Sequence, residues 1–213
     1  PQCGAPVILD EADRLLFCPF CRTKLYLTTP DHFRYHIPPS AGNPADLVYA
    51  PYWRLKGNSF SVYTSEVAPR FVDANILAAG NIKLPTSLGM RPQAMNMKFI
   101  SPDMPGRFLK ADVPTQGVTK ALEALGGTAL PGEPYFYRAF IGEMISLIYS
   151  PAYIEKDTLY DAFTRKRPTE WTPEEAKQQT NDAKPPDWQI RFISTLCPRC
   201  GWDMDGAKDA IVM

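Results

Sequence analysis

The sequence predicts a mainly β fold of the α+β class, and three observations lead to this prediction. The chain of 213 residues contains 22 prolines, which interrupt helices and strand ladders and so favour short elements with irregular connections. A seven-residue run, LVYAPYW at 47–53, returns in similar form as LIYSPAY at 147–153. Cysteine pairs lie near both ends of the chain, in CPFC at 18–21 and CPRC at 197–200. We therefore expect a β-rich core between two small cysteine-bearing units.

The similarity of the two runs extends over residues 47–64 and 147–164. It indicates a duplicated unit, with a chance likeness between two β-rich segments as the alternative. Each copy predicts a β-hairpin, in which an apolar strand is followed by a polar turn, LKGNS or EKDT, and a second strand. Pro51 and Pro151 cannot donate to a strand ladder, so each is expected at a sheet edge or a bulge. The identical pairs are Leu47/Leu147, Tyr49/Tyr149, Pro51/Pro151, Lys56/Lys156 and Thr64/Thr164.

Between and around the copies, the pattern predicts further strands and one or two helices. KLYLTT, HFRYHI, RFVDANILAAG and MNMKFIS have the character of strands. GVTKALEALGG predicts a helix, because its apolar residues recur about one turn apart and glycines follow. YRAFIGEMISLIY suits either a helix or a strand. A polar segment at 165–187 holds a capping box at Thr172–Glu175, which predicts a short exposed helix.

Composition limits the classes of function. Lys plus Arg and Asp plus Glu both number 23, so no global field draws the chain to nucleic acid or to an anionic membrane. The hydrophobic share of 45% is enough for a core. No apolar stretch is long enough to span a bilayer, and none at the start has the pattern of a signal peptide. We expect a cytoplasmic globular protein without membrane partners.

The cysteine spacing predicts metal binding. Cys3 lies in PQCG, which is a CPxCG knuckle if a cysteine directly precedes Pro1, and we expect one there. The order of this knuckle, a strand, the acidic turn DEAD, the strand RLLF and then Cys18 and Cys21 is the layout of a zinc ribbon. Two residues between thiolates let both sulfurs reach one ion, and a site with thiolates alone is structural. Disulfides or free thiols are the alternative.

Cys197 and Cys200 begin the same layout again. A turn, GWDMDG, and a strand, KDAIVM, follow them, so the next ligand is expected just beyond Met213, in a truncated second ribbon. In a competing geometry, one shared site holds Cys18, Cys21, Cys197 and Cys200 and leaves Cys3 as a spare. His32 or His36 could supply a missing ligand; the alternative is that both are ordinary surface histidines.

The ends of the chain, 1–21 and 197–213, resemble rubredoxin-like zinc ribbons. The middle, with PYWRLKG and SLGMRPQAMNMKFIS, resembles uncharacterised bacterial proteins in which zinc ribbons flank a β-rich region. The resemblance implies thiolate-bound zinc and no particular activity. The expected domains are a ribbon at 1–28, a β-rich core with the internal repeat at 29–164, a polar linker at 165–190 and a partial ribbon at 191–213.

No catalytic constellation is evident in the sequence. The chain has two histidines, neither in a catalytic signature, and no phosphate-binding glycine loop. Asp73 and Glu143 have apolar neighbours and could be tuned carboxylates, but pairing with Arg70, Arg91 or Arg138 is the commoner outcome.

YWRLKG could stack single-stranded bases beside Arg54 and Lys56, or could pack with Trp53 in the core. We expect a zinc-ribbon scaffold or adaptor that binds a protein and has no catalytic activity or small-molecule substrate. A nucleic-acid-binding module is the alternative.

Overall fold

The computed structural model describes residues 3–80, 84–89, 95–115, 117–118, 136–155, 158–164, 184, 188–204 and 206. The protein is mainly β, as predicted, and its strands form two sheets. The expected helix after Thr172 lies outside the described residues, and most of the one at 117–127 does too. The elements are β1 Leu15–Phe17, β2 Lys24–Thr28, β3 Phe33–His36, the 3-10 helix η1 Pro44–Asp46, β4 Val48–Val62, β5 Val67–Leu77, β6 Lys98–Phe99, β7 Arg107–Phe108, β8 Tyr137–Glu155, β9 Thr158–Asp161 and β10 Arg191–Ser194.

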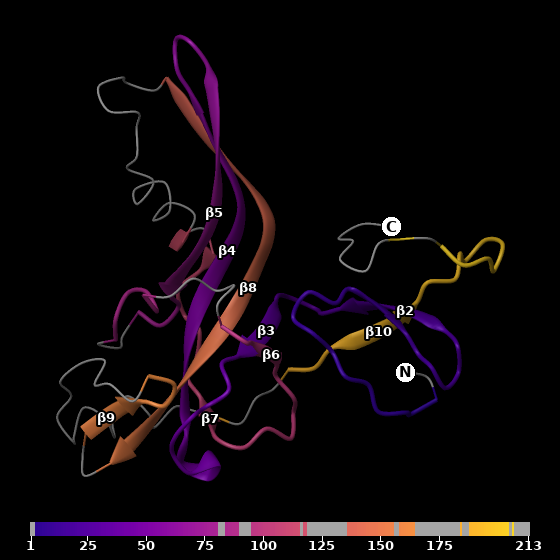
Figure 1. Ribbon diagram of the computed structural model, residues 1–213, viewed down its shortest axis with the longest axis horizontal. Coiled ribbons are helices and arrows are strands. Elements are labelled where there is room, and N and C mark those ends of the chain that lie inside the picture. Colours follow the sequence, from indigo (N-terminus) through magenta and orange to yellow (C-terminus); the bar gives the residue numbers. More distant parts are fainter. Residues whose placement is uncertain are drawn as a thin grey trace.

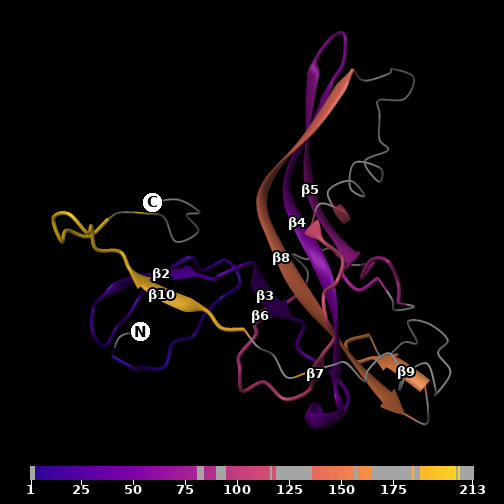
Figure 2. The ribbon, with the colours of Figure 1, turned by 180° about the vertical axis from the view of Figure 1, so that it is seen from behind.

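The smaller sheet, here the terminal sheet, joins the two ends of the chain. Its strand order is β1-β2-β10, and both pairs are antiparallel. Ile193 of β10 lies opposite Tyr26 of β2, which in turn lies opposite Leu15 of β1. The two terminal segments in which the sequence predicts ribbons therefore share one sheet, which stands beside the larger one (Figures 1 and 2).

The larger sheet, here the long sheet, is built on two long antiparallel strands. Its order is β5-β4-β8-β3-β6, with β7 also paired to β4 and β9 to β8. The pairing of β4 with β8 spans the whole of β4 and shifts register between Lys56 and Gly57. A Cβ on Gly57 would lie 2.3 Å from the carbonyl oxygen of Ile141, so the close approach of the strands at this bulge requires glycine.

The two similar runs pair with each other. Ala50 lies opposite Ser150, and the register continues symmetrically on both sides of this pair, so the runs are related by a local two-fold axis. The predicted turn at LKGNS is wrong, because β4 continues through it to Val62. The chain instead reverses where the N–H of Tyr63 donates to the carbonyl of Glu66. The second predicted hairpin is present as β8 and β9, and YRAFIGEMISLIY is entirely strand.

β4 and β8 pair with each other on one side and with other strands on the opposite, outer side. Pro51 and Pro151 each lie at the point where one outer strand ends and the next begins. On β4, Pro51 stands between the end of β7 and the paired part of β5, and its carbonyl accepts a 2.9 Å bond from the N–H of Ala78. On β8, Pro151 stands between β3 and β9, and its carbonyl accepts a 2.8 Å bond from the N–H of Ala162. The expectation of a sheet edge or a bulge is therefore wrong for both prolines, because β4 and β8 are interior strands that pair in register here. A residue without an N–H is tolerated instead because it lies at a break in the outer ladder.

The main apolar core packs on the N-terminal half of β4 and the C-terminal half of β8. Trp53 is buried there, and its indole N–H donates to the carbonyl of Val113 at 2.7 Å. Among the described residues, no helix has the length and apolar character to cross a membrane. The buried members of this core are Leu47, Tyr49, Trp53, Leu55, Ala78, Ile100, Phe108, Val118, Leu147, Tyr149, Ala162 and Trp188.

Candidate metal centre

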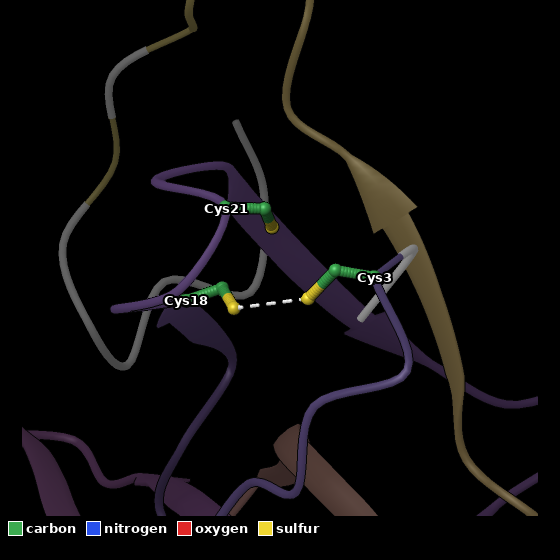
Figure 3. A group of neighbouring side chains, drawn as sticks. All are labelled: Cys3, Cys18 and Cys21. Carbon is green, nitrogen blue, oxygen red and sulfur yellow. Dashed lines mark hydrogen bonds between the residues drawn. The ribbon is translucent and has the colours of Figure 1, made fainter.

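Three thiols meet at one end of the terminal sheet. Cys18 and Cys21 lie in the turn between β1 and β2, and the N-terminal segment brings Cys3 against them (Figure 3). The sulfur atoms of Cys3 and Cys18 are 3.7 Å apart, and all three sulfurs lie within 4.8 Å of one another. Sulfur atoms around one tetrahedral ion are about 4 Å apart, so this cluster could hold a metal ion.

The backbone around Cys18 orients these thiols. The N–H of Arg22 donates to the carbonyl of Cys18 at 2.8 Å, and the N–H of Cys18 donates to the carbonyl of Thr23 at 3.0 Å. Arg22 has a φ of 59°, in the left-handed region that non-glycine residues rarely adopt. This tight turn points both sulfurs of CPFC to one side, toward Cys3 (Figure 3).

The second cysteine pair has the same backbone. The N–H of Gly201 donates to the carbonyl of Cys197 at 2.8 Å, and the N–H of Cys197 donates to the carbonyl of Trp202 at 2.8 Å. Gly201 has a φ of 71°, and Gly4, which follows Cys3, also has a φ of 71°. The residue that follows each knuckle, Gly4, Arg22 or Gly201, therefore has a left-handed backbone conformation.

The structure does not bring the four sulfurs of the shared-site alternative together. Cys197 and Cys200 are absent from the group of three thiols found among the described residues. They nevertheless lie at the same end of the terminal sheet, because the N–H of Thr195 donates to the carbonyl of Lys24 at 3.2 Å. The geometry favours two separate positions over the shared site.

Local hydrogen bonds favour the thiolate form of two of these cysteines. The hydroxyl and the backbone N–H of Thr23 lower the pKa of Cys21 to about 6. The backbone N–H groups of Arg199 and Cys200 lower the pKa of Cys197. All five cysteines are free thiols. The thiolate is the form that binds metal, so these hydrogen bonds favour metal binding by Cys21 and Cys197.

Neither histidine joins the thiols. The ring of His32 meets that of Trp53 edge-on, with 5.1 Å between centroids. The ring of His36 meets that of Tyr49 in the same way at 6.2 Å. Both histidines thus contact aromatic side chains of the long sheet, and neither belongs to the metal-binding group.

A buried ion cluster joins the terminal sheet to the long sheet. Arg54 binds Asp73 through two 2.8 Å hydrogen bonds and also contacts the carboxylate of Glu11. Only 3% of the Arg54 side chain and 5% of that of Asp73 are exposed. Arg54 is therefore the partner of Asp73, in place of the arginines expected from the sequence. Glu143 pairs with Lys56 at 3.0 Å on the surface.

Arg14 adds a second link between the sheets. Its guanidinium donates to the hydroxyl of Tyr35 at 3.2 Å and lies 4.3 Å from the ring centroid of Phe33. The hydroxyl of Tyr35 in turn donates to the carbonyl of Glu11. This role of Glu11 and Arg14 was not predicted, because the DEAD and RLLF segments by themselves indicate only an acidic turn and a strand.

No family model, curated protein or solved structure matches the chain.

Proposed function

We propose that this protein is a cytoplasmic adaptor for other proteins, whose terminal sheet is held together by structural zinc. Three thiolates at the distances found for Cys3, Cys18 and Cys21 suit a borderline-soft ion such as Zn²⁺. They supply three of the four positions of a tetrahedral ion. The preformed turn at Cys197 and Cys200 offers two thiolates for a second ion.

One observation carries the adaptor function: apart from Ile154, the exposed large apolar side chains of the described residues belong to two parts of the molecule. One group belongs to the terminal sheet and its turns. The other belongs to the tip of the long sheet, where β4 ends and β5 and β8 begin. Contiguous exposed apolar surface marks sites of protein interaction. The first group is Ile8, Phe17, Phe20, Ile193, Leu196 and Trp202, and the second is Val67, Phe71, Phe136, Tyr137 and Ile141.

Four of the tip residues share one face of the long sheet. Val67 and Tyr137 both pair with Val62, which places their side chains in one row across three strands. Phe71 and Ile141 both pair with Asn58, four residues along β4, and form a second row on the same face. A partner protein can cover both rows at once.

The burial of YWRLKG supports a protein partner over nucleic acid. Trp53 is 6% exposed and Arg54 is 3% exposed, so neither is available to stack on a base. The ion cluster is also consistent with an adaptor that has no catalytic activity, because Arg54 and Asp73 pair with each other.

The adaptor function is tested by recovering partners of the tagged full-length protein from cells after crosslinking. The wild type is compared with Phe71→Ser/Ile141→Ser at the tip and with Phe17→Ser/Ile193→Ser on the terminal sheet. We expect each double variant to lose a different partner protein while its zinc content stays unchanged. Recovery of the same partner proteins by the wild type and both double variants contradicts the proposal. Catalytic turnover of a small molecule by residues of the long sheet also contradicts it.

A further inference from the structure

A cavity of about 440 Å³ lies between the terminal sheet and the long sheet. Its walls come from distant parts of the chain: the segment 30–34, which leads into β3, the loop after β6, and the segment 188–191, which leads into β10. Cavities that bind small molecules commonly have about 300–1,000 Å³ and lie between structural units. The lining residues are Pro30, Asp31, Arg34, Pro102, Trp188, Gln189 and Arg191.

The carboxylate of Asp31 in this lining is already bound by three donors. Its Oδ2 accepts a 2.6 Å hydrogen bond from the guanidinium of Arg34. Its Oδ1 accepts 3.2 Å bonds from the hydroxyl of Thr29 and from the indole N–H of Trp188. Burial by itself raises the pKa of Asp31, but the bond from Arg34 and the other donors outweigh burial and lower it. Asp31 is therefore ionised at neutral pH and orients Arg34 and Trp188.

The two arginines of the lining keep unused donors. A guanidinium has five N–H groups in a fixed plane. Arg34 donates to Asp31 through Nη2, while its Nε–H has no partner. The side chain of Arg191 has no hydrogen-bond or ion-pair partner among the described residues. Two arginines and one aspartate give the described lining a net charge of +1, so the cavity favours an anion.

Both arginines are held in place by regular structure. Arg34 lies on β3, which pairs with β8, and its carbonyl accepts a 3.1 Å bond from the N–H of Ile100. Arg191 lies on β10, opposite Thr28 of β2. Trp188, which is buried in the main core, anchors the segment that leads to Arg191. Groups on strands are positioned more precisely than groups on loops, so little order has to be gained when a ligand binds.

We propose that this cavity binds a small monocarboxylic acid with an apolar body, whose carboxylate is held by Arg191 and the unused donors of Arg34. One negative charge balances the net charge of the lining, and the planar guanidinium matches the planar carboxylate. The apolar body lies against the rings of Pro30, Pro102 and Trp188. This binding site goes beyond the adaptor function, because its lining includes no residue of the two exposed apolar groups.

Other classes of ligand match the lining less closely. A phosphate monoester has a charge of about −1.5 to −2 at neutral pH, which exceeds the single positive charge of the described lining. A divalent cation requires several oxygen ligands, but the one carboxylate of this lining already accepts from three donors. A monoanion therefore remains the best match.

The test compares probes that share one phenyl ring: benzoate, neutral benzamide, phenyl phosphate and cationic benzylamine. Ligand-detected NMR titrations with the zinc-loaded full-length protein measure the affinity of each probe. We expect benzoate to bind at least about tenfold more tightly than benzamide, because the amide cannot form the charge-assisted bonds of a carboxylate. Benzoate should also bind more tightly than phenyl phosphate.

Variants of the arginines locate the site. Arg191→Gln should weaken benzoate binding at least about tenfold. The control is Arg107→Gln, which changes an exposed arginine of β7 outside the cavity and should leave the affinity unchanged. Arg191→Glu changes the net charge of the described lining from +1 to −1, so benzylamine should then bind in preference to benzoate. Unchanged thermal unfolding shows that each variant is folded.

Equal affinities for benzoate and benzamide overturn the proposal, as does the absence of benzoate binding at millimolar concentrations. Tighter binding of phenyl phosphate than of benzoate overturns it in favour of a phosphate site. Benzoate binding that survives both Arg191→Gln and Arg191→Glu also overturns it, because the anion then binds elsewhere on the protein.

Discussion

The terminal sheet has strands of three, five and four residues, whereas β4 and β8 of the long sheet run for 15 and 19 residues. The clusters of buried apolar residues lie almost wholly in the long sheet and its loops, and none includes a residue of β1, β2 or β10. A sheet this small buries too little apolar surface to be stable alone.

The two sheets therefore depend on different forces. The long sheet is stabilised by apolar packing and by a continuous backbone ladder. We propose that the terminal sheet depends on metal bound by its thiol cluster and on the ion contacts that join it to the long sheet. Perturbations that remove one of these forces should therefore affect one part more than the other.

The largest expected effect follows loss of the metal. Cys18→Ser or Cys21→Ser should unfold the terminal sheet and leave the long sheet folded, because structural zinc supplies about 10–16 kcal/mol of apparent binding free energy at neutral pH. Hydrogen exchange measures this result directly: amides of β1, β2 and β10 should lose protection, and those of β4 and β8 should keep it.

The matched control for that experiment is Cys200→Ser, which leaves the thiol cluster of Cys3, Cys18 and Cys21 intact. Its metal content should fall only at the second cysteine pair. Retention of stoichiometric metal at the first cluster in Cys18→Ser would show that the ligands are assigned wrongly.

The next largest effect is expected at the joint between the sheets. Arg54→Met leaves the buried carboxylate of Asp73 without its cation, and breaking a buried pair in this way costs about 3–5 kcal/mol. Urea unfolding monitored by circular dichroism measures the loss. The terminal sheet should also detach more readily, since Glu11 loses its contact with Arg54.

The double variant Arg54→Met/Asp73→Leu is the control for charge. It removes both buried ions, so most of the lost stability should return. A double variant as unstable as Arg54→Met alone would mean that the guanidinium acts through its packing rather than its charge.

A smaller effect, confined to the long sheet, is expected at the bulge. Gly57→Ala places a Cβ against the carbonyl oxygen of Ile141 and should cost about 1–3 kcal/mol, as overpacking does. The control is Gly142→Ala, whose Cβ would meet only the ring of Phe140 at 3.3 Å. Thermal unfolding should separate the two variants; equal melting temperatures would show that the strands can move apart at this position.

Much of the architecture was predictable where local chemistry decides it. The spacing of Cys3, Cys18 and Cys21 predicted the group of thiols that the structure brings together. The proline in each similar run predicted a sheet edge or a bulge, which is wrong, because both prolines lie in interior strands that pair in register.

Features that depend on distant partners were not predictable. The LKGNS segment has turn chemistry, yet it stays in β4 because its neighbours β5 and β8 both pair with it. The pairing of β10 with β2 joins residues from opposite ends of the chain, and no local pattern predicts it. The role of Arg54 likewise follows only from its position between Glu11 and Asp73.

The smallest expected effect concerns the pH dependence of the long sheet. Burial lowers the pKa of His36 below its usual value of 6.5, and the nearby Lys98 adds to this shift. The unfolded chain therefore takes up a proton at this residue near pH 6.5, while the folded protein does so only at lower pH. Stability from His36 is present above the unfolded pKa and is lost as the pH falls below it.

His36→Phe removes this proton uptake. When the pH falls from about 7 to about 5.5, the unfolding free energy of the wild type should decrease more than that of the variant. The extra decrease should be below about 1 kcal/mol. Urea unfolding of both proteins at the two pH values measures the difference, and because other groups titrate alike in both, their contributions cancel. A variant that loses as much stability as the wild type over this range would show that His36 is protonated equally in the folded and unfolded states.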